Sequence, residues 1–452
     1  RDLVRSRGLG DVYKRQLLLF QREPQFDVAL DKQIAEAADD FTRIALKAKA
    51  AKDYFLLVGP PGTGKTSCAL KKMVETFYKE EGAQILLLSY TNRAVDEICK
   101  ALSSIRPEVD FIRVGSELSC DENYRDHLIE NELATCMRRT EVCERINRCR
   151  ILVGTVASIS GKPELFRLKH FDVAIVDEAT QILEPQLLGI LCAKGENGKE
   201  GVGKFILIGD HKQLPAVVLQ NTEQSEVYDE ALSAVGLKNL KDSLFERLYR
   251  TARQHTDAHR TYDMLCRQGR MHPEVALFAN QAFYEGRLLP VGLPHQLEDS
   301  GNINRLSFYP SQPEPMGSSA KTNHSEAKIA ARLAATVYKE HSEAFDASRT
   351  LGIITPYRSQ IALVKKEIEA LGIPELNQIL IDTVERFQGS ERDVIIYSFC
   401  VNYPYQLKFL SNLTEEDGIL IDRKLNVALT RARKQMLLTG VPTLLELSLI
   451  HI

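Results

Sequence analysis

The 452-residue sequence lacks several features that mark whole classes of protein. No apolar run approaches the ~18 residues that cross a bilayer, and no signal-peptide pattern is present, so a membrane partner is not expected. None of the nine cysteines forms a CxxC pair, which favours reduced thiols in a reducing compartment, the cytoplasm. The net charge is only −3 and 44% of the residues are apolar, which excludes disorder for most of the chain.

Both ends of the sequence read as translated adapter DNA. The string GATGTGTATAAGAGACAG encodes residues 11–16, and its reverse complement encodes residues 447–452. The string resembles the end of a transposase-based sequencing adapter, so we expect residues 1–16 and 447–452 to be artefacts, with sequence missing beyond both ends. The alternative is a basic amphipathic leader. Residues 1–16 carry a charge of +3, which leaves −6 for the rest, so nucleic-acid binding would need a localised basic groove.

Short apolar runs alternate with helical patterns along the chain, which is typical of α/β folds with mostly parallel sheets. Strands are expected at 54–58, 85–89, 150–153, 173–176, 205–208, 351–354, 378–381, 394–399 and 435–438. The pattern blurs over residues 218–265, so two tandem units are the economical interpretation, with bounds of 17–260 and 261–446. Residues 100–150 are charged and are expected to form a helical insertion in the first unit. Residues 290–319, rich in Pro, Ser and Gly, are expected to form a connection or a flexible loop.

A glycine-rich loop follows the first expected strand. Residues 59–66 read Gly-Pro-Pro-Gly-Thr-Gly-Lys-Thr and fit the pattern G-x-x-x-x-G-K-[ST] between a strand and a helix. Backbone N–H groups of such a loop cradle phosphates, while Lys65 would reach the β- and γ-phosphates and Thr66 would bind Mg²⁺. The predicted nucleotide-binding residues are Gly59, Pro60, Pro61, Gly62, Thr63, Gly64, Lys65 and Thr66. The alternative is an ordinary glycine turn.

Two further expected strands end in polar residues suited to nucleotide hydrolysis. The strand at 173–176 precedes Asp177, which would hold Mg²⁺ through water, and Glu178, which would orient or deprotonate the attacking water. The strand at 205–208 precedes a polar segment in which Gln213 is a candidate sensor of the γ-phosphate. The alternatives are a strand that ends in solvated acids and a polar turn.

The order of these blocks resembles that of superfamily 1 helicases, most of all the 5′-to-3′ branch. That branch includes an RNA helicase of nonsense-mediated decay and a eukaryotic replication helicase–nuclease. Further blocks follow in the family's order, so that the resemblance spans residues 59–433. They are SYTNRAVD at 89–96, GDHKQLPAV at 209–217, QGRMHP at 268–273, GIITPYR at 352–358, DTVERFQGSE at 382–391 and NVALTRAR at 426–433.

The resemblance implies two RecA-like P-loop NTPase domains that bind ATP and Mg²⁺ between them. Arg270 and Arg431 would stabilise the charge that develops on the γ-phosphate, and Gly389 and Glu391 would contact phosphate and ribose. The implied partner is single-stranded nucleic acid, held through its backbone without sequence preference. DNA is favoured, but the choice between DNA and RNA stays open because no residue is a recognisable reader of the 2′-hydroxyl. The implied strand contacts are Thr91, Asn92, Thr155, Thr355, Tyr357, Arg358 and Thr383. As lone residues, these have helix caps or turns as the alternative.

The sequence departs from the family where the nucleotide base is read. The family's Gln, about 17 residues before the first motif, falls near Thr42 here, and Gln33 lies further upstream. Gly269 stands where the family often has a Tyr. We therefore expect relaxed nucleotide specificity, with GTP or CTP hydrolysed nearly as well as ATP. Residues 17–58 are too few for the family's β-barrel, and the cysteine spacings within 100–150 match no zinc pattern.

Three functions fit these motifs. The first is a nucleic-acid-dependent NTPase that translocates 5′ to 3′ along single strands and unwinds duplexes. The second is an NTP-dependent switch that remodels nucleic-acid or protein complexes without unwinding. The third is the helicase module of a helicase–nuclease, with a nuclease domain elsewhere in the same chain. The motifs do not separate them, because NTP hydrolysis and strand separation use different parts of such proteins.

Overall fold

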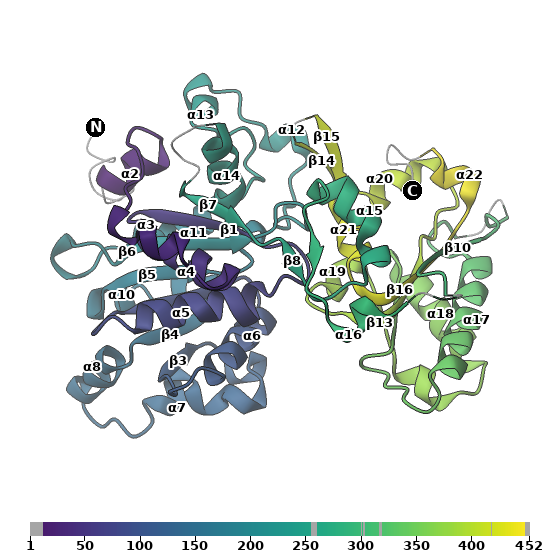
Figure 1. Cartoon of the computed structure of the whole chain (residues 1–452), viewed down its shortest axis with the longest axis horizontal. Helices are drawn as coiled ribbons and strands as arrows, with labels where there is room; N and C mark the ends of the chain where they lie inside the picture. The colour runs from purple at the N-terminus through teal and green to yellow at the C-terminus, as the bar shows by residue number, and fades with distance from the viewer. Residues whose placement is uncertain are drawn as a thin grey trace. The chain divides into compact units, whose positions relative to one another are not determined.

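The computed structural model describes residues 12–254, 260–299, 301, 303–315, 319–416 and 418–447. The chain divides into two compact units (Figure 1). The first comprises the residues up to Pro60, Gly64–His211 and Pro215–Leu265, and the second comprises Pro61–Thr63, Lys212–Leu214 and the residues from Cys266 on. Among the described residues, no helix is both long enough and apolar enough to cross a membrane.

The first unit is built on a seven-stranded sheet in which every neighbouring pair runs parallel. Its order is β3-β4-β2-β5-β6-β1-β7. The strands are β1 (Tyr54–Val58), β2 (Ile85–Ser89), β3 (Phe111–Val114), β4 (Ile151–Thr155), β5 (Phe171–Val176), β6 (Val202–Gly209) and β7 (Tyr262–Met264). Most of them are short apolar runs buried on both faces, as parallel strands between helices require. Val58 pairs with Gly209 and Leu88 with Val176, so the segments after these strands meet at one edge.

Helices cover both faces of this sheet and divide its core into two layers. Along β1, Phe55 and Leu57 face one layer while Leu56 and Val58 face the other. The first layer is closed by α4 (Asp40–Ala50), α5 (Lys71–Tyr78) and α6 (Asn92–Ser103). The second layer is closed by α9 (Val156–Ser160), α11 (Glu184–Leu191) and α14 (Leu244–Gln254). The sheet is therefore held from both sides, with its strand ends left to form a site.

The segment 100–150, expected to be helical, is mixed. It contains the helices η3 (Glu117–Ser119), η4 (Glu122–His127), α7 (Ile129–Glu132) and α8 (Arg139–Arg148), but also the edge strand β3. Arg113 interrupts the apolar run of β3 and hides the strand in the sequence. Its side chain is nevertheless fully buried, and it donates hydrogen bonds to Asp96 and, at 3.3 Å, to the carbonyl of Ser119.

The second unit is built on a five-stranded parallel sheet of order β10-β16-β13-β11-β12. The strands are β10 (Leu306–Pro310), β11 (Leu351–Ile354), β12 (Leu380–Asp382), β13 (Arg392–Ser398) and β16 (Ala432–Gly440). One face is covered by α17 (His324–Glu340) and α18 (Arg358–Glu369), whose Ala and Val side chains pack on β11 and β13. The helices α15 (Pro273–Tyr284) and α21 (Arg423–Leu429) and the hairpin β14 (Leu413–Glu416)–β15 (Ile419–Asp422) complete the unit.

The expectation that residues 290–319 form only a connection or a flexible loop is corrected. They contain α16 (Pro294–Leu297) and the edge strand β10. The side chains of β10 are largely exposed, Leu306 to 45% and Phe308 to 41%, so the sequence there lacks the buried apolar run of the other strands. A search for buried apolar runs therefore misses this exposed edge strand.

The two ends of the chain are described in part. Helix α2 (Val12–Leu18) extends across residue 16, and its Leu17 and Leu18 lie in the core of the first unit. Lys14 is buried and donates a hydrogen bond to the carbonyl of Leu191 at 3.0 Å. Residues 1–11 and 448–452 lie outside the described residues. The origin of both ends in adapter DNA stays a prediction.

Candidate nucleotide and nucleic-acid sites

The glycine-rich loop follows β1, and the side chain of its Lys65 hydrogen-bonds back to the start of the loop. The backbone N–H of Gly59 donates to the carbonyl of Gly209 at 2.9 Å, and Lys65 Nζ donates to the carbonyl of Gly59 at 2.6 Å. A Cβ on Gly59 would lie 2.1 Å from Lys65 Cγ, so any larger residue there would force the Lys65 side chain to move. Gly62 and Gly64 have φ of 73° and 76°, a left-handed conformation that favours glycine. The helix η2 (Lys65–Leu70) begins directly after them.

Thr66 and Asp177 form a hydrogen-bonded pair beside this lysine. Thr66 Oγ1 donates to Asp177 Oδ2, and Asp177 is only 1% exposed at the end of β5. Burial raises the pKa of Asp177, against the opposing effects of the Thr66 hydrogen bond and the charge of Lys65. A hydroxyl and a carboxylate oxygen side by side fit Mg²⁺, which takes its other ligands from water and phosphates. No cluster of three or more His, Cys, Asp or Glu suited to a metal lies in the described part of the chain.

Glu178 takes a strained backbone conformation immediately after Asp177. Its φ of 54° is left-handed, which is uncommon for a residue other than glycine. Its backbone N–H donates to Asp177 Oδ1 at 2.9 Å, and its side chain is half-buried, in contrast to that of Asp177. Such strain is found mostly at functional sites, because the surroundings must hold it. The two neighbouring carboxylates therefore have different environments, as their different predicted roles require.

Gln213 and Arg431 lie together in the second unit. Gln213 Oε1 accepts a hydrogen bond from Arg431 Nη2 at 3.2 Å. Arg431 is 2% exposed, and it also donates to the carbonyls of Val427 at 2.9 Å and Ser390 at 3.4 Å. These contacts with neutral oxygens hold the Arg431 guanidinium in place, and its charge also acts on Glu391.

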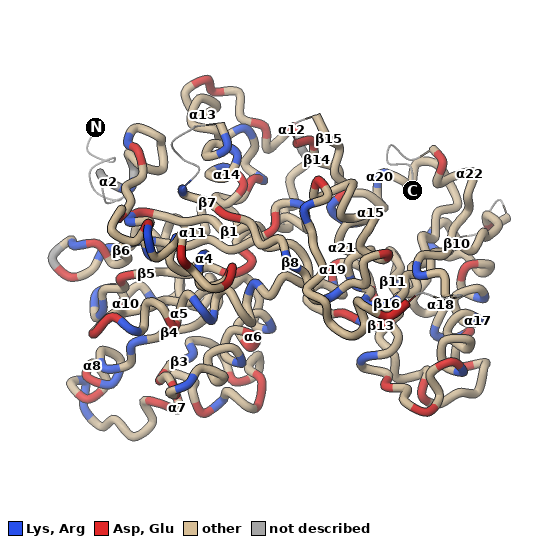
Figure 2. Tube along the Cα trace, viewed as in Figure 1, with Lys and Arg blue, Asp and Glu red and all other residues tan. Residues whose placement is uncertain are grey.

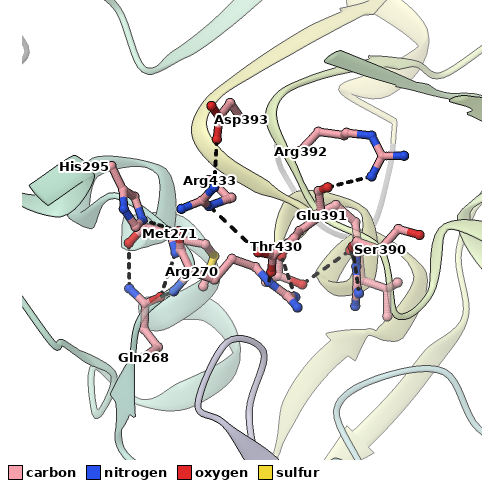
Figure 3. Close-up of polar contacts among 12 residues, drawn as sticks. Gln268, Arg270, Met271, His295, Ser390, Glu391, Arg392, Asp393, Thr430 and Arg433 are labelled. Carbon is pink, nitrogen blue, oxygen red and sulfur yellow. Dashed lines mark hydrogen bonds and ion pairs between the residues drawn. The ribbon is translucent and has the colours of Figure 1, made fainter. Parts of the chain in front are cut away.

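A cluster of arginines and carboxylates surrounds Arg270 (Figure 3). Arg270 Nε lies 2.5 Å from Glu391 Oε2, and its Nη1 donates to the carbonyl of Thr430 at 3.2 Å. Arg433 pairs with Asp393 at 3.1 Å and lies 3.8 Å from Glu391. Burial would raise the pKa of Glu391, but the charges of the arginines outweigh it and hold this pKa below its usual value. Glu391 therefore binds Arg270 in this structure, and its contact with ribose stays a prediction.

Gln268 and His295, which are not among the predicted site residues, fix the backbone of Arg270. Gln268 Oε1 accepts hydrogen bonds from the N–H groups of Arg270 at 3.0 Å and Met271 at 2.7 Å. His295 Nε2 lies 2.8 Å from the carbonyl of Arg270 (Figure 3). The motif QGRMHP contains Gln268 and could have indicated its role, whereas nothing in the sequence around His295 does so. His272 caps α15 by accepting from the N–H of Glu274.

The predicted strand contacts lie at the end of β4 and after β2, β11 and β12. Thr91 and Thr155 accept hydrogen bonds from backbone N–H groups at the starts of α6 and α9, so they act as helix caps here. Thr355 is fully buried, and its Oγ1 has no hydrogen-bond partner among the described residues. Tyr357 accepts a hydrogen bond from Gln406 at 3.2 Å. The remaining predicted contacts lie at helix starts or next to them: Asn92 on α6, Arg358 on α18 and Thr383 before α19 (Val384–Phe387).

The positions expected to read the nucleotide base are occupied as follows. Thr42 Oγ1 donates to Asp39 at 2.6 Å within the first turn of α4, and the side chain of Gln33 is exposed on α3 (Asp31–Ala35). A Cβ on Gly269 would lie 3.2 Å from Leu293 Cδ1, so Leu293 packs where a larger side chain would begin. Gly389 has φ of 78°, which explains glycine at that position in the turn before β13.

Comparisons with known proteins agree with these features. A family model described as an AAA domain matches residues 36–142 and 129–221, and a second model with that description matches residues 240–443. The chain is 28% identical to the DNA replication ATP-dependent helicase/nuclease DNA2 of Bos taurus, over 95% of this chain and 40% of that protein. It is 30% identical to the Xenopus laevis protein of the same name, over 87% of this chain and 36% of that protein.

Two further similarities complete the comparison. The DNA polymerase alpha-associated DNA helicase A of Saccharomyces cerevisiae is 26% identical over 89% of this chain and 64% of that protein. A solved complex of arterivirus nonstructural protein 10, a helicase, with DNA has a TM-score of 0.42 at 16% identity, over 88% of this chain and 62% of that one, which is too weak to add to the assignment. The chain spans about two-fifths of the length of the DNA2 proteins. From the two matched models and these relatives, the chain belongs to the superfamily 1 helicases.

Proposed function

We propose that this protein is a nucleic-acid-dependent NTPase that hydrolyses ATP with Mg²⁺, translocates 5′ to 3′ along single strands and unwinds duplexes. The observation that carries the proposal is the glycine-rich loop closed on Lys65 beside the Thr66–Asp177 pair. This arrangement joins backbone donors, one cation and a metal-binding pair at the end of one parallel sheet. It is the chemistry that a nucleoside triphosphate with a divalent cation requires.

Each residue of the site would have a distinct role in hydrolysis. Lys65 and the loop N–H groups would bind the β- and γ-phosphates, and Thr66 and Asp177 would hold Mg²⁺, which neutralises phosphate charge when it is bound. Glu178 would orient the attacking water or accept its proton. Gln213 would sense the γ-phosphate, and Arg270 and Arg431 would stabilise the charge that develops on it.

Single-stranded nucleic acid is the proposed track, and DNA is favoured over RNA because the relatives above are named as DNA helicases. Contacts from Thr91, Asn92, Thr155, Thr355, Tyr357, Arg358 and Thr383 would go to the strand backbone and would be insensitive to sequence. The nine cysteines are all free, which supports a reducing compartment, the cytoplasm, as the location.

The helicase module of a helicase–nuclease is the second candidate. It is favoured by the relatives whose names join helicase and nuclease, of which this chain spans about two-fifths. A nuclease domain in the same chain would then act on the strands that this module separates.

Strand displacement tests the proposal. Labelled duplexes with a 5′ or a 3′ single-stranded overhang would be mixed with ATP, Mg²⁺ and the protein, with Lys65→Ala as the control for contaminating helicase. Displacement from the 5′ overhang alone, lost in Lys65→Ala, is the expected result. Displacement from the 3′ overhang alone would overturn the proposed polarity and indicate translocation from 3′ to 5′. NTP hydrolysis stimulated by strands without displacement of either duplex would replace unwinding by the remodelling switch.

A further inference from the structure

A pair of stacked tyrosines, of which Tyr405 is exposed and Tyr403 is half-buried, follows β13 in the second unit. The rings of Tyr403 and Tyr405 lie 10° from parallel with their centroids 5.7 Å apart. Tyr405 is 56% exposed, and Phe409, on α20 (Leu407–Leu410), is 64% exposed. Burying an aromatic side chain is favourable, and leaving it exposed to water forgoes that free energy. Exposed aromatic side chains gathered within a few residues therefore indicate a binding surface.

The sheet topology brings this pair to the edge where strand contacts are predicted. The strands β12, β11 and β13 are parallel neighbours, and Ile354 of β11 pairs with both Asp382 of β12 and Tyr397 of β13. The segments that follow these three strands therefore leave the sheet at the same edge. Tyr357 follows β11, Thr383 follows β12 and the tyrosine pair follows β13.

A buried amide fixes the pair relative to Tyr357. Gln406 Nε2 donates to the hydroxyl of Tyr357 at 3.2 Å and to the carbonyl of Ala320 at 2.6 Å. Gln406 Oε1 accepts from the backbone N–H groups of Asn402 at 2.9 Å and Tyr403 at 3.0 Å. Gln406 is only 2% exposed, so its hydrogen bonds hold the turn without competition from water.

A buried carboxylate holds the start of the same turn. Glu326 accepts hydrogen bonds from Ser398 Oγ at 2.7 Å and from the backbone N–H of Cys400 at 2.8 Å. Cys400 has φ of 49°, a left-handed conformation in place of the extended backbone of β13, which ends at Ser398. The aromatic pair is thus presented by a network of buried polar groups, and little ordering is needed when a ligand binds.

The charges around the pair suit an anionic strand. Arg358, Lys321 and Lys408 are exposed, and all three lie within two residues of Tyr357, Ala320 or Gln406. Over the chain as a whole, basic and acidic residues are interspersed (Figure 2), so local groups of this kind decide where a polyanion binds.

We propose that Tyr403 and Tyr405 form a platform on which unpaired bases of single-stranded nucleic acid stack. Tyr357 and Arg358 would contact the backbone of the same strand beside this platform. The proposal rests on the proposed function and adds to it a contact with the bases. Every base has a π-face, so the platform binds bases without selecting a sequence.

Binding to matched strands with and without bases tests the platform. The full chain and its Tyr405→Ala and Tyr405→Phe variants would be titrated with labelled oligo(dT) and with an abasic strand of equal length. Tyr228→Ala, which removes a tyrosine that is 79% exposed in the first unit, is the matched control. Tyr405→Ala should weaken oligo(dT) binding by about 5- to 150-fold and leave abasic-strand binding within about 2-fold. Tyr405→Phe and Tyr228→Ala should bind both strands like the wild type.

Since the sequence contains no Trp, Tyr405→Trp adds a single indole whose fluorescence should be quenched by oligo(dT) and not by the abasic strand. Unchanged oligo(dT) binding by Tyr405→Ala would overturn the platform. Equal weakening on both strands would also overturn it, because a structural role would then explain the loss. Failure of the wild type to bind any strand would overturn the proposed function itself, which makes the two failures distinguishable.

Discussion

The two units use similar parallel sheets to hold opposite kinds of site. In the first unit, Gly59, Lys65 and two carboxylates lie at or just after strand ends, and Lys65 donates to the carbonyl of Gly59 and lies near the charge of Asp177. In the second unit, the strand ends and nearby turns carry Arg270, Arg431 and Arg433, balanced by carboxylates and carbonyls. We propose that the first arrangement binds a phosphate chain and its metal and that the second supplies positive charge.

Buried carboxylates show the same contrast. Asp177 in the first unit is buried beside Lys65 and Thr66, where its carboxylate would face the predicted Mg²⁺. Glu326 in the second unit is fully buried and accepts hydrogen bonds from hydroxyl and amide groups. The first carboxylate belongs to the proposed metal site, and the second holds a turn through its hydrogen bonds.

The largest effect is expected in the arginine cluster. Arg270→Ala should lower kcat for NTP hydrolysis by about 10³-fold, because an arginine that stabilises the transferring phosphoryl group is worth at least that much. The nucleotide Kd should change only a few-fold, since this charge is needed mainly in the transition state. The measurement is steady-state hydrolysis with a separate titration of a fluorescent nucleotide. Arg433→Ala is the matched control from the same cluster, and an equal loss there would remove the special role of Arg270.

Lys65→Ala should differ from Arg270→Ala in that it weakens nucleotide binding as well as turnover. The variant should lose about 100-fold or more in kcat and should also bind nucleotide more weakly, because Lys65 contacts the phosphates in both ground and transition states. The same two assays compare it directly with Arg270→Ala. Retained nucleotide affinity in Lys65→Ala would contradict the assignment of phosphate binding to the first unit.

Glu326 should make the stability of the second unit depend on pH. Burial raises its pKa from 4.5 to about 7, so the folded state holds this proton more tightly than the unfolded state. The protonated Glu326 side chain contributes on the order of 3 kcal/mol to the free energy of unfolding. This contribution is fully present below pH 4.5 and is lost as the pH rises through about 7. Denaturant unfolding at pH 5 and pH 8 should therefore show a smaller loss of stability in Glu326→Gln than in the wild type. Parallel pH profiles for the two proteins would show that Glu326 does not titrate in this range.

Glu391→Gln should lower kcat about tenfold with little change in KM, which corresponds to ~1.4 kcal/mol of transition-state stabilisation. The reason is that Glu391 lies 2.5 Å from Arg270 and orients it. A rise in KM at constant kcat would instead support the predicted contact with ribose. Kinetics with ATP at saturating strand concentration decides between the two roles.

The smallest effect concerns the base of the nucleotide. GTP and CTP should be hydrolysed with kcat/KM within about 5-fold of the value for ATP. This ratio corresponds to a smaller free-energy difference than one good hydrogen bond contributes. The physical reason is that Gly269 has no side chain and Thr42 hydrogen-bonds within its own helix turn. Competition between the three nucleotides measures this ratio, and a preference for ATP of 100-fold would contradict it.

The sequence predicted the central part of the fold well, because buried parallel strands are continuous apolar runs. The strands at 54–58, 85–89 and 351–354 have the expected bounds. It missed β3, whose run is broken by the buried Arg113, and β10, whose side chains are exposed at an edge. Periodicity reports burial of apolar groups and is insensitive to a buried charge or an exposed strand.

The candidate site was predictable where backbone geometry demands particular residues. Gly59, Gly62 and Gly64 are fixed by close approach or positive φ, so their pattern is visible in the sequence. The residues that orient Arg270 and the tyrosine pair act through tertiary contacts. His295, Gln406 and Glu326 lie far from their partners in the sequence, and such contacts become visible only in the folded chain.

The rate of NTP hydrolysis with and without single-stranded DNA or RNA tests the central claim most directly. The wild type would be compared with Lys65→Ala and Glu178→Gln under the same conditions. We predict stimulation of at least about tenfold by one of the polymers, with greater stimulation by DNA than by RNA, and loss of activity in both variants. A rate that neither polymer changes, or that either variant retains, would contradict the account.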